Sequence, residues 1–213
     1  MSFRMVPLLV FLFSCALLYV TYNQTYNYFT YDTIKFQHLD ENRKFYVCKN
    51  VVKGMYLSAL VVAGIIPVYF GLIHDIWDDT MFKILASMYV SNDVVGMFRV
   101  RKLPTTTRLH HTACIILLIM AWTIDFDTNN TGQLLVLYTY FSALAFPVNL
   151  YLGLRFLYDL PRLKSFAKYL YLGTCSLNWM LQLYYANEIN YMYIGLICII
   201  IVDDLVLLKW LFK

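Results

Sequence analysis

Three long segments of the chain contain no Asp, Glu, Lys or Arg. They extend over Gly54–Ile73, Thr128–Leu154 and Tyr169–Asn187. A helix needs about 20 mostly apolar residues to cross the hydrocarbon core of a bilayer. Only 14% of the 213 residues are charged and 61% are hydrophobic, whereas about a quarter of an ordinary soluble domain is charged. Such a chain cannot cover itself with polar surface, so the sequence predicts an integral membrane protein.

Four further apolar segments raise the expected number of spans to seven. The sequence lacks the period-two alternation of a membrane β-strand, and lipid leaves the helix as the remaining spanning element because each backbone group must be satisfied within its segment. The expected fold is therefore all-α, a polytopic protein with seven transmembrane helices. The additional spans are Met5–Thr21, Met81–Phe98, Leu109–Ile124 and Asn190–Leu208.

Positive charge gathers in every second connection between these spans. All but Arg4 and Lys83 of the 17 Lys and Arg residues fall on one side of the predicted bundle. Basic connections remain in the cytoplasm, so we expect a lumenal N-terminus and a cytoplasmic C-terminus. The net charge of +4 is too small to indicate a nucleic-acid partner. Five cysteines without a CxxC pair fit neither a disulfide framework nor a zinc site.

Ionisable residues inside spans are costly and are functional-site candidates by default. The predicted topology places Asp93, His110 and His111 in the same cytoplasmic half of the bilayer, together with Asp203 and Asp204. The short connection after Asp93 predicts antiparallel packing that brings this carboxylate near the histidines. A carboxylate beside an imidazole fixes its tautomer, as in general base catalysis. The alternative is an ordinary, half-solvated helix start at the interface.

A basic connection precedes the histidine pair, and it has two interpretations. The favoured interpretation is a positive-inside signal that sets the orientation of the protein in the membrane. The more specific interpretation is a phosphate clamp for an anionic headgroup or coenzyme A. Metal binding is not expected, because the only partner at i+4 spacing from His110 is Cys114. The basic residues in question are Arg99, Arg101, Lys102 and Arg108.

Two amide side chains and a proline stand out within the apolar runs. Asn149 and Asn178 would seek partners in lipid, and hydrogen bonds between helices are favoured over contacts with a substrate. Pro147 is expected to kink its span, which can open a cavity.

The residues around the histidine pair resemble the central signature of the TLC-domain family. The stretch Met88–Asp93 is followed about seventeen residues later by Leu109–Thr112 and an apolar helix. Weaker similarity covers Pro147–Asn149 with Arg155–Phe156, and Leu177–Trp179. The family includes ceramide synthases, translocon-associated membrane proteins and small TLC-domain lipid regulators.

The resemblance implies a six-helix bundle around a cavity open toward the cytoplasm, preceded in the synthases by an additional helix. It covers the expected TLC-like membrane domain over 44–213. The apolar start of the chain predicts an N-terminal transmembrane helix over residues 1–21, and the Tyr- and Phe-rich composition that follows predicts an interfacial linker over 22–43 in the headgroup layer. By analogy with the family, the endoplasmic reticulum is the expected location.

Ceramide synthases use paired histidines to transfer an acyl group from acyl-coenzyme A to the amine of a sphingoid base. The resemblance makes His110 and His111 the base and acyl acceptor, supported by Asp93. No bound cofactor is expected. The expected substrates are acyl-coenzyme A and a membrane lipid. A homodimer is one oligomeric state that the sequence allows. Candidate substrate-binding residues are Arg99, Arg101, Lys102, Arg108, Asn149, Asn178 and Asp203.

The chain also departs from the synthases. They carry a further pair of aspartates on the helix after the histidines, whereas Thr128–Leu154 contains no acidic residue. Asp203 and Asp204 lie at a suitable depth to replace that pair. The alternative function is a non-catalytic, lipid-binding regulator of membrane lipid composition, and a cargo or translocon partner ranks last.

Overall fold

The computed structural model describes residues 5–184 and 191–213. Every regular element within these residues is a helix, which confirms the all-α prediction. The elements are α1 (Met5–Asp32), α2 (Ile34–Gln37), α3 (Glu41–His74), α4 (Asp79–Arg99), α5 (Thr105–Thr123), α6 (Asn130–Ala143), α7 (Phe146–Leu154), α8 (Pro161–Tyr184) and α9 (Tyr191–Leu211).

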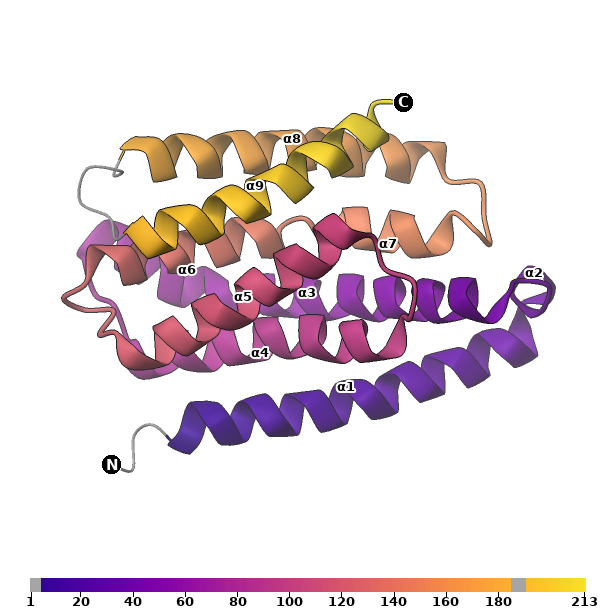
Figure 1. Cartoon of the computed structure of the whole chain (residues 1–213), viewed down its shortest axis with the longest axis horizontal. Coiled ribbons are helices and arrows are strands. Elements are labelled where there is room, and N and C mark those ends of the chain that lie inside the picture. The colour runs from indigo at the N-terminus through magenta and orange to yellow at the C-terminus, as the bar shows by residue number, and fades with distance from the viewer. Residues whose placement is uncertain (1–4, 185–190) are drawn as a thin grey trace.

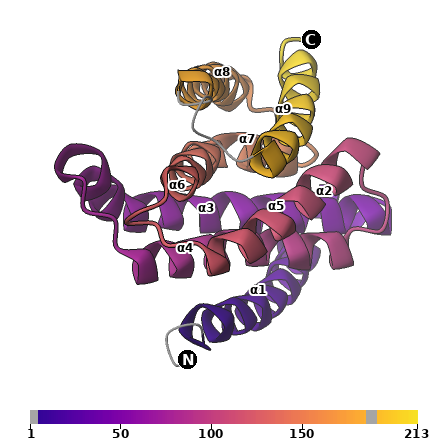
Figure 2. The ribbon, with the colours of Figure 1, turned by 60° about the vertical axis from the view of Figure 1, so that its left-hand side comes forward.

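The helices run back and forth along the long axis of one bundle (Figure 1). α1 packs against α4 and α3, α3 packs most extensively against α7, and α5 lies between α4 and α9. α8 covers α6 and α7 on the opposite side of the bundle from α1 (Figure 2). The start of α3, the end of α4, the start of α5 and the end of α9 consequently meet at one end of the molecule (Figure 1).

Four segments of the described chain are long and apolar enough to cross a membrane. They are α1, α3, α9 and the continuous stretch Asn130–Leu154 that contains α6 and α7. These segments support a membrane protein. The remaining long helices, α4, α5 and α8, are more polar. Arg4, one of the two basic residues predicted on the lumenal side, lies outside the described residues, as do the predicted span ends at Asn187 and Asn190.

The predicted linker over residues 22–43 is wrong in its boundaries. α1 continues to Asp32, and α3 already begins at Glu41. The aromatic side chains of this region pack into the bundle: Tyr22 is buried and donates its hydroxyl to Asn92 Oδ1 at 3.0 Å. The rings of Phe29 and Phe36 lie 5.4 Å apart. Tertiary packing therefore extends the helix through a segment whose composition suggested a headgroup-layer linker.

The apolar run over Thr128–Leu154 is interrupted near its middle. α6 ends at Ala143 and α7 begins at Phe146, with Pro147 in the first turn of α7. Proline lacks a backbone N–H and cannot bond to the carbonyl four residues earlier. The break agrees with the kink expected at Pro147, and it turns α7 toward the start of α3.

Two glycines allow α3 and α7 to approach each other closely. A Cβ atom added at Gly54 would lie 2.6 Å from Leu150 Cγ, and one added at Gly153 would lie 2.9 Å from Val51 Cγ2 and 3.0 Å from the Val47 carbonyl oxygen. Close backbone approach through small residues is typical of helix packing in membranes. This contact fixes α7 beside the first half of α3.

We expect Gly153→Ala to lower the stability of the purified protein. The new methyl group meets backbone and side-chain atoms of α3, and overpacking of this kind costs about 1–3 kcal/mol. Gly173→Ala is the matched control, because a Cβ atom there meets nothing within 4 Å, and alanine improves helix propensity by up to about 1 kcal/mol. Thermal unfolding in a neutral detergent compares the two. Equal unfolding temperatures for both variants would contradict the close packing.

Candidate active site

A cavity of about 350 Å³ opens between the helices at the end of the bundle where α3 and α5 begin. Both predicted histidines, His110 and His111, line it together with Asp203 and Asp204. Its walls come from α3, α5, α7, α8 and α9, with a contribution from the end of α6. The break between α6 and α7 therefore lies beside the cavity.

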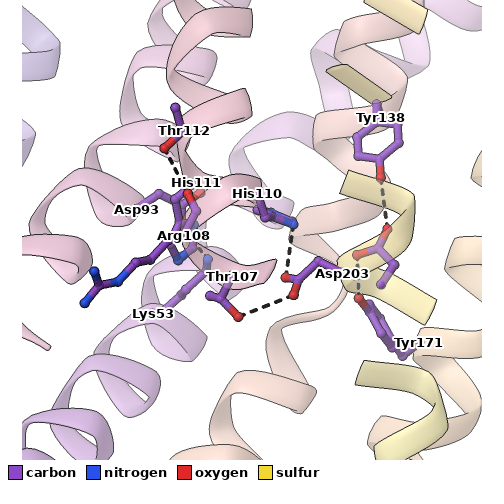
Figure 3. Close-up of polar contacts among 11 residues, drawn as sticks. Lys53, Asp93, Thr107, Arg108, His110, His111, Thr112, Tyr138, Tyr171 and Asp203 are labelled. Carbon is purple, nitrogen blue, oxygen red and sulfur yellow. Dashed lines mark hydrogen bonds and ion pairs between the residues drawn. The ribbon is translucent and has the colours of Figure 1, made fainter. Parts of the chain in front are cut away.

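Asp93 is the centre of a buried charged cluster behind this cavity. Its side chain has no exposed surface, and its Oδ1 atom lies 2.5 Å from Lys53 Nζ and 3.2 Å from His111 Nδ1. The three residues come from α4, α3 and α5 respectively, as the close-up shows (Figure 3). Asp93 thus joins three helices, and the carboxylate lies next to the histidine as the antiparallel packing of α4 and α5 predicts.

His110 has a carboxylate of its own, supplied by α9. His110 Nδ1 lies 3.4 Å from Asp203 Oδ2, and Thr107 donates its hydroxyl to Asp203 Oδ1 at 3.4 Å (Figure 3). The two imidazole rings are nearly perpendicular, at 82°, with centroids 5.4 Å apart. Adjacent residues on a helix point about 100° apart, so the two histidines face different carboxylates.

The two histidines differ in access to the cavity. The His110 side chain is 13% exposed, and the His111 side chain is 3% exposed. Both ring nitrogens of His111 are buried and make no hydrogen bond that meets geometric criteria. His110 is therefore the imidazole that a molecule in the cavity can reach first.

Asp204 forms a separate polar contact on the α8 and α9 side of the cavity. Tyr171 donates its hydroxyl to Asp204 Oδ1 at 2.7 Å, and Tyr138 donates to Oδ2 at 2.9 Å. Both oxygens of this buried carboxylate are thus hydrogen-bonded, as buried charge requires. Asp204 links α6, α8 and α9 and shapes the wall of the cavity.

The basic connection predicted as a phosphate clamp does not line the cavity. Arg99 faces α1, donating to Asn23 Oδ1 at 2.5 Å, and its guanidinium lies 5.0 Å from the centre of the Tyr19 ring. Arg108 is exposed and donates to the Arg101 carbonyl oxygen, and Arg101 and Lys102 are exposed as well. The positions of these residues favour their interpretation as a signal of orientation in the membrane over their interpretation as a phosphate clamp.

Both predicted amides do line the cavity. Asn149 Nδ2 donates to the carbonyl oxygen of Ala145 at 3.4 Å, within its own helix. Asn178 accepts from Gln182 Nε2 at 3.3 Å, and Gln182 also donates to the Leu134 carbonyl oxygen on α6. The hydrogen bond of Asn178 thus lies within α8, and Gln182 makes the contact between α8 and α6.

The sequence interpretation missed the cationic side chains of the cavity. Lys49, Lys53 and Arg155 line it, although their charges were assigned to membrane topology alone. A usable signal was present, because Tyr46, Lys49, Lys53 and Leu57 recur at helical spacing and therefore share one face of α3. That face points into the cavity.

His110 and two neighbouring side chains lie close enough together to hold a metal ion. Ligand atoms of Asp93, His110 and Cys114 lie within 4.8 Å of one another. Lys53 already places an ammonium group against the Asp93 carboxylate, and a metal ion there would meet that positive charge at close range. The charge balance therefore favours the lysine over a metal as the partner of Asp93.

Comparisons with protein-family models, with curated protein sequences and with solved structures find no match.

We expect Lys53→Met to destabilise the protein strongly. The substitution removes the ammonium from a carboxylate with no exposed surface, and breaking a buried ion pair from one side costs about 3–5 kcal/mol. The double variant with Asp93→Asn should recover much of that loss, because no buried charge is then left unpaired. Thermal unfolding of the single and double variants measures both effects.

Lys44→Met serves as the matched control on the same helix. Lys44 pairs with Glu41, whose side chain is 62% exposed, and an exposed ion pair contributes about 0–1 kcal/mol. A loss of stability at Lys44→Met as large as that at Lys53→Met would show that the burial of the Asp93 pair is not what matters.

Proposed function

We propose that the protein is a TLC-type membrane enzyme of ceramide or sphingolipid metabolism that transfers an acyl group from acyl-coenzyme A to a lipid amine. The observation that carries the proposal is the presence of two imidazoles beside one cavity, each with a carboxylate at its Nδ1 atom. His110 lies against Asp203, and His111 lies against Asp93. The carboxylate of Asp203 favours one orientation of the His110 ring and leaves its Nε2 to act on a substrate, whereas both ring nitrogens of His111 are buried.

His110 is the proposed general base, because it is the more accessible of the two rings. It removes a proton from the lipid amine as the nitrogen attacks the thioester carbonyl carbon. The new C–N bond forms, the C–S bond breaks, and the proton passes from His110 to the departing coenzyme A thiolate. His111, whose ring nitrogens are buried, is the second histidine of the pair and assists the transfer of this proton.

The proposal includes seven spans and the orientation expected from charge. α4, α5 and α8 carry polar residues that face the interior of the bundle, among them Asp93, His110 and Asn178. Polar side chains are tolerated in membrane helices where they face a bundle interior, which supports counting these three helices as spans. The basic end of the bundle, with the cavity, would then face the cytoplasm, and the endoplasmic reticulum is the proposed membrane.

A second candidate function is a lipid-binding regulator that uses the same cavity without chemistry. The absence of acidic residues over Thr128–Leu154 and the burial of both His111 ring nitrogens favour it.

The activity test uses purified protein in nanodiscs with labelled acyl-coenzyme A and a sphingoid base. We expect His110→Ala to lower the rate of amide formation by about a hundredfold or more, the range typical of losing a general base. Asp203→Asn should lower it less, because the imidazole remains. His74→Ala is the control, since His74 lies at the far end of α3, against Tyr69 and Phe70.

Product formation that is unaffected by His110→Ala would contradict the proposed base. If the thioester persists in every sample while a defined lipid copurifies with the protein, the enzyme proposal fails and the binding function stands.

The number of spans has its own test. Tags placed before residue 1 and after residue 213 should lie on opposite sides of the membrane, because seven is odd. Four spans, the number of segments of the described chain that are apolar enough to cross by composition, would place both tags on the same side. Protease protection of each tag in sealed vesicles distinguishes these outcomes.

A further inference from the structure

Lys49 is a buried cation that lines the cavity without a protein partner. The residue is 4% exposed, and it takes part in none of the ion pairs or hydrogen bonds found in the described part of the chain. Its neighbour one turn later, Lys53, is matched by Asp93. The two lysines on this face of α3 therefore differ, because Lys53 is ion-paired with Asp93 whereas the Lys49 ammonium lines the cavity with no ion pair to the described chain.

The Lys49 side chain is held in place along its aliphatic stem. A Cβ atom added at Gly96 of α4 would lie 3.0 Å from Lys49 Cε and 3.4 Å from Cγ. The glycine thus leaves a channel in which the stem passes over the α4 backbone, so that the ammonium group reaches the cavity.

A second unmatched cation lines the same cavity. The Arg155 guanidinium lies 4.3 Å from the centre of the Trp210 ring and 4.8 Å from that of Phe156, and its buried Nε atom makes no hydrogen bond. The Phe156 ring in turn contacts Tyr46, at 6.0 Å between centroids. Tyr46 lies one turn before Lys49 on α3, and Tyr46, Lys49 and Arg155 all line the cavity.

The negative charges around the cavity are already engaged by other groups. Asp93 pairs with Lys53 and His111, Asp203 contacts His110 and Thr107, and Asp204 accepts from two tyrosines. A buried ammonium with no counter-charge is strongly unfavourable, and so is an unsatisfied guanidinium. A ligand that brings negative charge would satisfy both.

We propose that Lys49 and Arg155 form a binding subsite for a phosphate group of the ligand that occupies the cavity. A phosphate offers several acceptor oxygens and negative charge, and it matches an arginine fork beside a lysine point charge. This assignment rests on the proposed function for the identity of the site. It adds that the substrate carries a phosphate group, which binds at this subsite. That phosphate belongs to either coenzyme A or a phospholipid headgroup, and it binds inside the cavity instead of at the Arg99 to Arg108 connection.

Ligand-induced thermal stabilisation tests the subsite, because a ligand that binds only the folded state raises its unfolding temperature. In a neutral detergent, coenzyme A is compared with pantetheine, which lacks the phosphates. In the same detergent, short-chain phosphatidic acid is compared with the matching diacylglycerol. We expect one phosphate-bearing probe to stabilise the wild-type protein and its phosphate-free counterpart not to. The probe that acts identifies the source of the phosphate.

The variants Lys49→Met and Arg155→Met should each bind that probe at least about tenfold more weakly. Lys35→Met removes the same charge at an exposed position of α2 and should bind as the wild type does. Without ligand, Lys49→Met should unfold at the same temperature as the wild type or higher, because an unpaired buried charge is removed. A lower unfolding temperature would assign Lys49 a structural role and overturn the proposal.

Binding that is unchanged in Lys49→Met, or the absence of stabilisation by either phosphate-bearing probe, would also overturn the subsite. The His110→Ala variant separates this test from that of the proposed function. It should retain phosphate binding even though it loses acyl transfer, and a wild-type protein that binds phosphate without transferring an acyl group would refute the enzyme alone.

Discussion

A carboxylate without exposed surface lies in the middle of this apolar helix bundle because an ammonium group and an imidazole lie against it. The contact of Asp93 with Lys53 and His111 joins α3, α4 and α5, so these helices cannot shift independently without separating buried charges. In a medium of low polarity, such a separation is far more costly than in water. The position of the histidine pair at the start of α5 therefore depends on this ion pair.

The cavity beside this cluster lies where α7 packs closely against α3 and where the helix is interrupted between α6 and α7. Gly54 and Gly153 bring α7 against α3, and the interruption before Pro147 lets α7 follow α3 while α6 follows a different direction. Asp204 and its tyrosines hold α9 to α6 and α8 on the far wall. The result is a space lined by both polar and apolar side chains at the basic end of an otherwise apolar bundle.

The sequence predicts the helical class, the membrane character, and the proximity of Asp93 to the histidine pair, because all three depend on local composition and on one short connection. It does not reveal that Lys49 and Lys53 face inward, because a lysine near a span boundary is also the ordinary signature of orientation. It also misplaces the boundary of α1, where Tyr22 and Phe29 extend the helix by packing on distant residues. These features depend on partners far apart in the chain.

The most direct measurement is an experimental structure of the protein in a nanodisc with a thioether analogue of acyl-coenzyme A, in which the sulfur cannot leave. The account predicts density in the cavity, with the carbon next to the sulfur beside His110 and the acyl chain running between the helices. An analogue bound outside the cavity, away from both histidines, would contradict the central claim that this cavity is the site of chemistry.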